Sequence, residues 1–155
     1  MIVTLKLKQK NMESSNKNNP FYSKTGTDKV NITDEEWKKI LPADVYYIAR
    51  QKGTERPGTS KYESSKETGK FHCAACGNPL FESDTKFESG CGWPSFFAPL
   101  TKESMIYTSD TSHGMKRTEV QCGRCEAHLG HLFNDGPPPT GLRYCINGVA
   151  LQFES

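Results

Sequence analysis

Short apolar runs bounded by turn residues dominate the chain from about residue 61 onwards. They cover residues 69–76, 78–83, 85–89, 95–100, 104–109, 116–122 and 142–153. Gly, Pro, Asn, Asp and Ser separate the runs, as is typical of short strands. In the last run Val149, Leu151 and Phe153 alternate with their neighbours, and a period of two indicates a strand with one buried face. The pattern predicts a mainly β domain, either a sandwich or a barrel-like sheet.

A helical pattern precedes these strands. Thr33 and Glu36 have the spacing of a capping box, which marks the N-terminus of a helix. Pro42 ends this first short helix, and residues 43–51 form the second. Residues 52–60 read KGTERPGTS and are rich in turn residues. We therefore expect two short helices and a turn segment ahead of the strands.

The first 28 residues differ in composition from the rest of the chain. They are rich in Asn, Ser and Lys and show no apolar periodicity. Such a segment cannot bury enough apolar surface to offset the entropy of ordering it. We predict a disordered N-terminal tail over residues 1–28 and a single domain over residues 29–155.

Charge and hydropathy argue against two classes of protein. The net charge of +2 is too small to indicate a nucleic-acid footprint, and no apolar run approaches the roughly 20 residues of a membrane span. Lysines interrupt the first ten residues, which therefore lack a signal-peptide core, and the first arginine is Arg50, which disfavours a mitochondrial transit peptide. We expect a cytoplasmic protein, with the mitochondrion as the alternative, that binds neither nucleic acid nor membrane.

Four of the six cysteines form two C-x-x-C pairs, Cys73 with Cys76 and Cys122 with Cys125. This gap lets both thiolates of a pair reach one ion, and two such pairs are the pattern of a tetrahedral zinc site. Two disulfides are disfavoured, because nothing indicates a secreted chain. A redox-active C-x-x-C would explain one pair alone. We predict that the four cysteines hold a structural Zn²⁺ ion.

A second combination of residues also has the spacing of a zinc site. His128 and His131 continue the spacing of three that begins at Cys122 and Cys125. A site of two cysteines and two histidines from this segment would leave the first C-x-x-C pair without a role. We reject it for that reason.

Two cysteines remain, Cys91 on a glycine-flanked loop and Cys145 within the last apolar run. Residues two apart on a strand share a face, so Arg143, Cys145 and Asn147 are expected on one face. A nearby cation favours the thiolate, which is the reactive form of cysteine. Cys145 is therefore either a buried structural cysteine or a nucleophile with Cys91 as its spare partner.

Histidines and aromatic residues could complete a pocket around these thiols. His128 and His131 flank a Leu-Gly pair that reads as a turn, and histidine exchanges protons near neutral pH. Trp93 and Phe97 follow Cys91 closely in the sequence. Each residue alone is more simply read as a core or surface side chain, but together with two spare thiols they indicate thiol redox chemistry.

Three segments, SGCGWPSF, HLGHLFNDGP and GLRYCINGVAL, together with the two C-x-x-C pairs and the upstream KGTERPGTS, resemble the B-type methionine sulfoxide reductases. The resemblance covers about residues 31–153. It implies a fold of two antiparallel sheets (β-tent type) with short N-terminal helices and a structural zinc site. It also implies reduction of methionine-R-sulfoxide, free or in oxidised proteins and peptides, by a chain expected to be a monomer.

The resemblance further implies a role for each spare residue. Cys145 corresponds to the nucleophile that becomes a sulfenic acid, and Cys91 to the thiol that resolves it into a disulfide reduced by thioredoxin. His128 and His131 correspond to histidines near the sulfoxide oxygen. Trp93 and Phe97 correspond to residues of the substrate pocket. Arg143 and Asn147 correspond to residues that support the thiolate and the site.

Two other functions compete with a reductase. A zinc-ribbon-like binding module would need no reactive thiol and would show a basic or aromatic face if it bound nucleic acid. The lysines are instead spread widely along the chain. A general thiol oxidoreductase would carry its reactive C-x-x-C in a βαβ context, which the pattern of strands does not provide.

Overall fold

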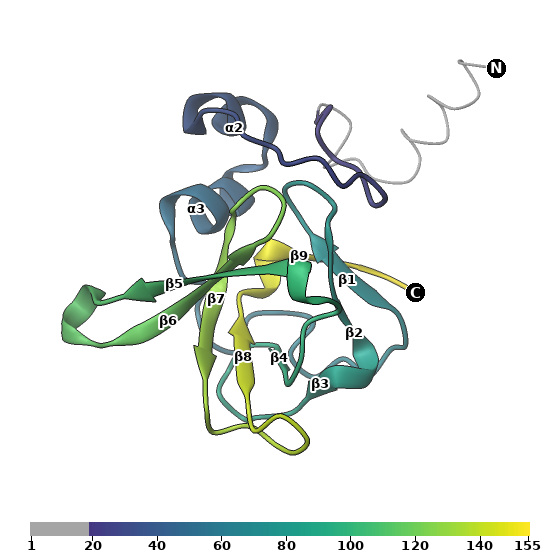
Figure 1. Cartoon of the computed structure of the whole chain (residues 1–155), viewed down its shortest axis with the longest axis vertical. Coiled ribbons are helices and arrows are strands. Elements are labelled where there is room, and N and C mark those ends of the chain that lie inside the picture. Colours follow the sequence, from purple (N-terminus) through teal and green to yellow (C-terminus); the bar gives the residue numbers. More distant parts are fainter. Residues whose placement is uncertain (1–18) are drawn as a thin grey trace.

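The computed structural model of the protein describes residues 19–155. Within that range the strands form two antiparallel sheets, as the family resemblance implied (Figure 1). The three-stranded sheet has the order β2(Pro79–Glu82), β1(Lys70–Cys73), β9(Leu151–Glu154). The six-stranded sheet has the order β3(Lys86–Phe87), β4(Ser95–Phe96), β8(Arg143–Ile146), β7(His128–Phe133), β6(Arg117–Cys122), β5(Met105–Asp110).

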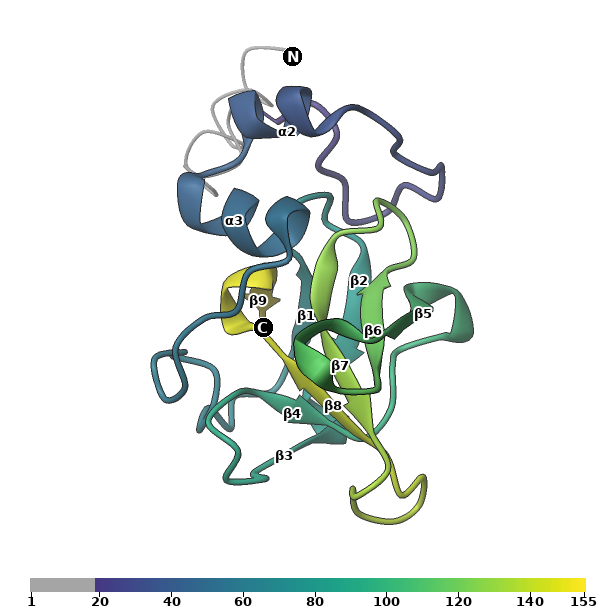
Figure 2. The same ribbon diagram turned by 90° about the vertical axis from the view of Figure 1, so that its left-hand side faces the viewer.

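Two short helices lie at one end of the sheets, beside the turns that join β1 to β2 and β6 to β7 (Figures 1 and 2). The first, α2(Asp34–Ile40), begins with the predicted capping box, in which the Glu36 N–H donates to Thr33 Oγ1 at 3.1 Å. The second, α3(Ala43–Gln51), follows directly after Pro42. In the described part of the chain, no helix has the length and apolar character that crossing a membrane requires.

A stack of aromatic rings joins the two sheets. Phe81 of β2 lies parallel to Phe96 of β4, with ring centroids 4.1 Å apart and an interplanar angle of 9°. Phe71 of β1 meets the edge of Phe96 at 5.1 Å, and Tyr144 of β8 meets Phe81 at 5.8 Å. All four side chains are buried. Side chains alternate along a strand, so the opposite faces of β4 and β8 are directed away from this core.

Residues 19–28 pack against the domain, which corrects the predicted boundary of the tail. The Asn19 side chain is buried and donates to Ala75 O at 2.7 Å, and the Ser23 N–H donates to Cys76 O at 2.8 Å. The Arg124 guanidinium donates to Ser23 O and Asp28 O. Hydrogen bonds to backbone, which composition does not reveal, anchor this segment. The rest of the predicted tail, residues 1–18, lies outside the described residues.

The last apolar run is also less regular than the sequence predicted. Strand β8 ends at Ile146, and a 3₁₀ turn over Gly148–Ala150 separates it from β9. The two strands belong to different sheets. The run therefore links the sheets, and the alternation of Val149 with Leu151 does not describe one continuous strand.

The aromatic stack generates a stability prediction. Phe96→Ala should lower the free energy of unfolding by about 3–5 kcal/mol, because it leaves a cavity between the sheets. Met115→Ala is a matched control, since Met115 is 47% exposed and should change stability by about 0.5 kcal/mol or less. Urea unfolding of both variants measures the difference. Equal midpoints would show that the stack does not hold the sheets together.

Candidate active site

A row of polar side chains crosses one face of the six-stranded sheet. Cys145 of β8 lies directly opposite Ser95 of β4 and His131 of β7, and His131 lies opposite Glu119 of β6. Directly opposed residues of antiparallel strands project to the same face. The neighbours of Cys145 and Ser95 along their strands, including Phe96, belong to the core on the other face. Strand pairing alone therefore brings a thiol, a hydroxyl, an imidazole and a carboxylate together.

The two spare thiols lie in contact. Cys91 Sγ is 3.6 Å from Cys145 Sγ, although 53 residues separate the loop cysteine from the strand cysteine. Gly90 and Gly92, with φ of 75° and 100°, give the loop its left-handed turns on either side of Cys91. A disulfide requires the sulfur atoms to approach to about 2.05 Å, so a small movement suffices to join this pair.

The two thiols differ in acidity. Burial, and after it the neighbouring Cys91, raise the pKa of Cys145 to about 12 against the opposing effect of Arg143. Burial alone would also raise the pKa of Cys91, but hydrogen bonds from Ser89 and Ser95 outweigh it and hold that pKa below its ordinary value. In the resting pair Cys145 therefore keeps its proton through neutral pH, and Cys91 loses its proton first.

Arg143 occupies the predicted face of β8 and is bound on two sides. Its guanidinium donates to Asp135 Oδ1 at 2.8 Å and to Oδ2 at 3.2 Å. It also lies over the Phe133 ring, 4.3 Å from the centroid. Asp135 is thus the anion that orients Arg143. These contacts hold a positive charge near Cys145.

Asn147 does not join that group in the predicted way. Strand β8 has ended before it, and its buried side chain accepts from the Glu55 N–H at 2.9 Å and donates to Leu129 O at 3.0 Å. The prediction of one shared face is confirmed for Arg143 and Cys145, whereas Asn147 bonds to backbone on both sides. The alternation expected along a strand does not extend to Asn147, because β8 ends one residue before it.

The two histidines are on strand β7 rather than around a turn, which corrects the sequence prediction. Val120 pairs with Gly130, but Gln121 pairs with His128, so Leu129 is an extra residue in the strand. Such a bulge reverses the alternation. His128 and His131, three residues apart, consequently lie together with ring centroids 5.5 Å apart.

Each histidine is held by a carboxylate. Asp110 Oδ2 is 2.7 Å from His131 Nε2, and Glu119 Oε2 is 2.7 Å from His128 Nδ1. Burial lowers the pKa of His128, although Glu119 opposes that shift. The Lys52 ammonium, at the end of α3, bonds to the other oxygen of Glu119 at 3.2 Å. Both imidazole rings are therefore fixed in orientation.

The predicted aromatic pocket is only partly assembled. Trp93 is half-buried, and its indole N–H donates to Glu55 O at 3.1 Å. Phe97 lies past the end of β4, where its backbone bonds to Thr85 O and to the Thr140 hydroxyl. Within residues 19–155 no ring contact joins Phe97 to Trp93. The Trp93 side chain is therefore hydrogen-bonded to a loop of the site, whereas Phe97 bonds only through its backbone.

A cavity of about 430 Å³ lies beside the thiol pair. Cys91, Ser89, Phe87, Pro137 and the Arg143–Asp135 pair contribute to its lining. The cavity gives a small molecule or an extended peptide an approach to the Cys91 sulfur. Its lining combines apolar surface with one ion pair.

Sequence reasoning missed several residues of this site. Glu119 and Asp110 could have been noticed in the sequence. Each is an acidic residue in a strand, and the residues directly before and after it are uncharged. Ser89 and Ser95 lie in the quoted segment around Cys91 but resemble ordinary loop serines. Glu55 lies in a turn segment, and nothing in the sequence indicates its contacts.

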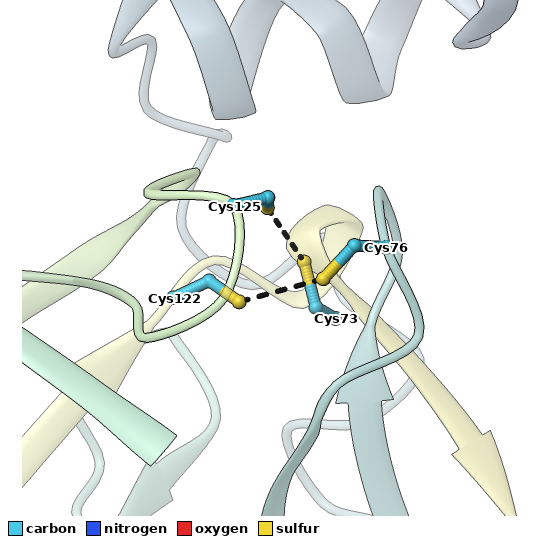
Figure 3. Close-up of side chains that lie close together, drawn as sticks. All are labelled: Cys73, Cys76, Cys122 and Cys125. Carbon is cyan, nitrogen blue, oxygen red and sulfur yellow. Dashed lines mark hydrogen bonds between the residues drawn. The ribbon is translucent and has the colours of Figure 1, made fainter. Parts of the chain in front are cut away.

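The remaining four cysteines lie apart from this face, at the end of the sheets where the helices pack (Figure 3). Their Sγ atoms all lie within 4.8 Å of one another, and all four side chains are buried. The Cys73–Cys125 and Cys76–Cys122 sulfur distances are 3.7 and 3.6 Å. Ligands of a tetrahedral ion at a metal–sulfur distance of about 2.3 Å lie roughly 3.8 Å apart. The four thiols therefore fit one tetrahedral metal ion, and the histidines belong to the other site.

Comparison with known proteins agrees with this arrangement. Residues 41–155 match the family model described as the SelR domain. The chain is 61% identical over 126 residues to a protein of Pseudomonas putida (strain W619) named peptide methionine sulfoxide reductase MsrB, which covers 81% of this chain and 95% of that protein. A protein of the same name from Pseudomonas syringae pv. syringae (strain B728a) is 60% identical over 125 residues, again 81% of this chain and 95% of the relative.

The match includes both C-x-x-C pairs, the two histidines and both spare thiols, because the SelR region spans them all. The chain belongs to the SelR family and, within it, to the B-type peptide methionine sulfoxide reductases.

Proposed function

We propose that the chain reduces the R epimer of methionine sulfoxide, free or in peptides, through a cycle in which Cys145 attacks and Cys91 resolves. The observation that carries this proposal is the 3.6 Å contact between the two sulfur atoms. A lone nucleophile could accept the oxygen, but only a neighbouring thiol can convert the product to a disulfide without a second protein.

The first step transfers oxygen from one sulfur to the other. Cys145 Sγ attacks the sulfoxide, the S–O bond of the substrate is broken, and methionine and a Cys145 sulfenic acid are formed. The thiol is oxidised by two electrons and the sulfoxide is reduced by two. Atoms balance because the thiol proton ends on the transferred oxygen.

Protonation of the sulfoxide oxygen makes it a better leaving group. Cys145 brings a proton itself, because its pKa is raised to about 12 by burial. His131, directly opposite on β7, is the imidazole that relays it, and Asp110 orients that ring at 2.7 Å. His128 has the supporting role, because Glu119 holds its ring inside the fold.

The other residues of the site position the substrate and the thiolate. Trp93 forms the wall against the substrate methyl group, whereas Phe97, which makes no ring contact with Trp93 within residues 19–155, is not part of that wall. Arg143 stabilises negative charge on Cys145, in agreement with its opposing effect on the pKa of that thiol. Asn147 maintains the turn after β8 through its bonds to Glu55 and Leu129.

The second step returns the enzyme to a reducible state. Cys91 Sγ attacks the sulfenic sulfur, water leaves, and a Cys91–Cys145 disulfide forms. The lowered pKa of Cys91 favours this attack. A dithiol of the thioredoxin type then reduces the disulfide, and the cavity beside Cys91 offers it an approach.

The metal in the four-cysteine site is Zn²⁺ in this proposal. Four buried thiolates at tetrahedral spacing match the donor set that zinc prefers for structural sites. Each C-x-x-C is a knuckle between strands of one sheet, β1 with β2 and β6 with β7. The ion would therefore tie the two sheets together at the end covered by the helices, away from Cys145.

Separate variants of the two thiols test the cycle. Cys145→Ser should abolish reduction of a peptide methionine-R-sulfoxide, because serine cannot form the sulfenic acid. Cys91→Ser should keep activity with dithiothreitol but fall at least about tenfold with thioredoxin as the reductant. The S epimer serves as the substrate control for the wild type. Thioredoxin-dependent turnover that survives in Cys91→Ser would remove the resolving role.

The pH dependence of alkylation tests the acidities of the pair. Thiolate is the reactive form, so a lowered pKa gives reaction at lower pH and a raised pKa delays it. As pH rises from 7 to 9, iodoacetamide should modify Cys91 well before Cys145, as read by peptide mapping. In Cys91→Ser the reaction of Cys145 should begin at lower pH, because one cause of its raised pKa is gone. Prior modification of Cys145 at every pH would contradict this order.

Substitution of one metal ligand tests the zinc assignment. Cys76→Ser should lose zinc and about 4 kcal/mol or more of unfolding free energy, because three thiolates no longer complete the site. Cys91→Ser is the matched control and should retain one zinc ion per chain. Metal analysis and urea unfolding report the two quantities. A stable Cys76→Ser protein with a full complement of zinc would show that the ion is bound elsewhere.

A further inference from the structure

Glu55, in the turn segment between α3 and β1, bonds to both halves of the site with its backbone. Its N–H donates to Asn147 Oδ1 at 2.9 Å, and its carbonyl accepts from the Trp93 indole N–H at 3.1 Å. Asn147 lies two residues after Cys145, and Trp93 lies two residues after Cys91. One residue therefore connects the segment of the nucleophile to the loop of the resolving thiol.

The Glu55 carboxylate makes a second connection to the same segment. Gly148 N–H donates to Oε2 at 2.7 Å and Val149 N–H donates to Oε1 at 3.0 Å. Hydrogen bonds to a charged acceptor are stronger than those to a neutral one. Both donors belong to the start of the 3₁₀ turn that follows Asn147. The carboxylate thus fixes the backbone directly after β8.

The turn after β8 approaches the Glu55 segment so closely that position 148 requires glycine. A Cβ at Gly148 would lie 1.9 Å from Ser60 Oγ, so any side chain would push the Glu55 segment away. Two residues before Ser60, the Gly58 N–H donates to Gly92 O at 2.7 Å. A Cβ at Gly92 would lie 2.7 Å from Pro57 Cβ. The positive φ of Gly92 is a second reason for glycine at this position. The segment is therefore clamped between two glycines, one in each half of the site.

We propose that Glu55 is a positioning residue that sets the distance between the Trp93 wall and the Cys145 segment. The inference rests on the proposed function, because it assumes that substrate lies between Trp93 and Cys145. Glu55 bonds to neither thiol and acts through Trp93, Asn147 and the turn after β8. Without its carboxylate, the turn after β8 keeps only the Asn147 bond to Glu55, so its position relative to Trp93 is less firmly set.

This role predicts an effect on substrate binding more than on the thiol chemistry. The row of Cys145, His131 and Ser95 is held by strand pairing, which does not involve Glu55. The position of Trp93 relative to that row depends on the Glu55 segment. A displaced wall weakens capture of the methyl group, so KM rises while kcat changes little.

Glu55→Gln tests the proposal with the least change in volume. The amide places N–H groups against the backbone donors of Gly148 and Val149, and at least one bond is lost. We expect KM for a peptide methionine-R-sulfoxide to rise about tenfold and kcat to stay within about twofold. Glu67→Gln, at an exposed position, is the matched control and should leave both constants unchanged.

Two further variants keep the test decisive. Glu55→Asp retains the charge with a shorter reach, and its KM should lie between those of the wild type and Glu55→Gln. Trp93→Phe removes the indole donor, and the double variant with Glu55→Gln should show less than the product of the two single effects on KM, because both act through one wall. Should Glu55→Gln fail to fold, the KM of Glu55→Asp decides alone.

The outcomes separate this inference from the proposed function. Wild-type protein that reduces neither epimer overturns the function itself. Active wild type with an unchanged KM in Glu55→Gln and Glu55→Asp overturns the positioning role. A fall in kcat alone, with KM unchanged and a lower melting temperature, would show that Glu55 only stabilises the fold.

Discussion

The pairing of β8 with β4 on one side and β7 on the other is the constraint on which the rest of the site depends. It places Ser95, Cys145 and His131 in one line across the sheet. Register in a sheet cannot slip by one residue without turning every side chain to the other face. Here a slip would bury the thiol and expose Tyr144. The aromatic stack between the sheets therefore also fixes which residues lie on the face opposite the core.

The six cysteines fall into two groups that differ in their surroundings in the fold. Four are fully buried at the helical end of the sheets, where each has three sulfur neighbours and a closed metal site fits. The other two are half-buried on the opposite face from the aromatic core and lie in contact with each other. A closed four-thiolate site leaves no position for a substrate. In the proposed function, this separation lets one chain use thiols both to bind a structural metal ion and to exchange electrons.

The sequence predicted the elements whose signals are local. The capping box at Thr33, the C-x-x-C pairs and the shared face of Arg143 and Cys145 each follow from spacing within a few residues. The resemblance to a family added the functional assignments that spacing alone could not supply.

Features that depend on distant partners were missed or misplaced. The bulge at Leu129 that joins the histidines depends on the register with β6. The contacts of Glu55 with residues more than 90 positions away have no local signature. Likewise, residues 19–28 look disordered by composition because their anchors are backbone carbonyls of the cysteine loops.

A single-turnover experiment on the wild-type protein is the strongest test of the cycle proposed for Cys145 and Cys91. Fully reduced enzyme is mixed with excess peptide methionine-R-sulfoxide without any reductant, and methionine and disulfides are quantified. The proposed cycle predicts about one methionine per chain and one disulfide that joins Cys91 to Cys145, with the other four cysteines unchanged. Methionine formed without that disulfide, or a disulfide that involves one of the four clustered cysteines, would contradict it.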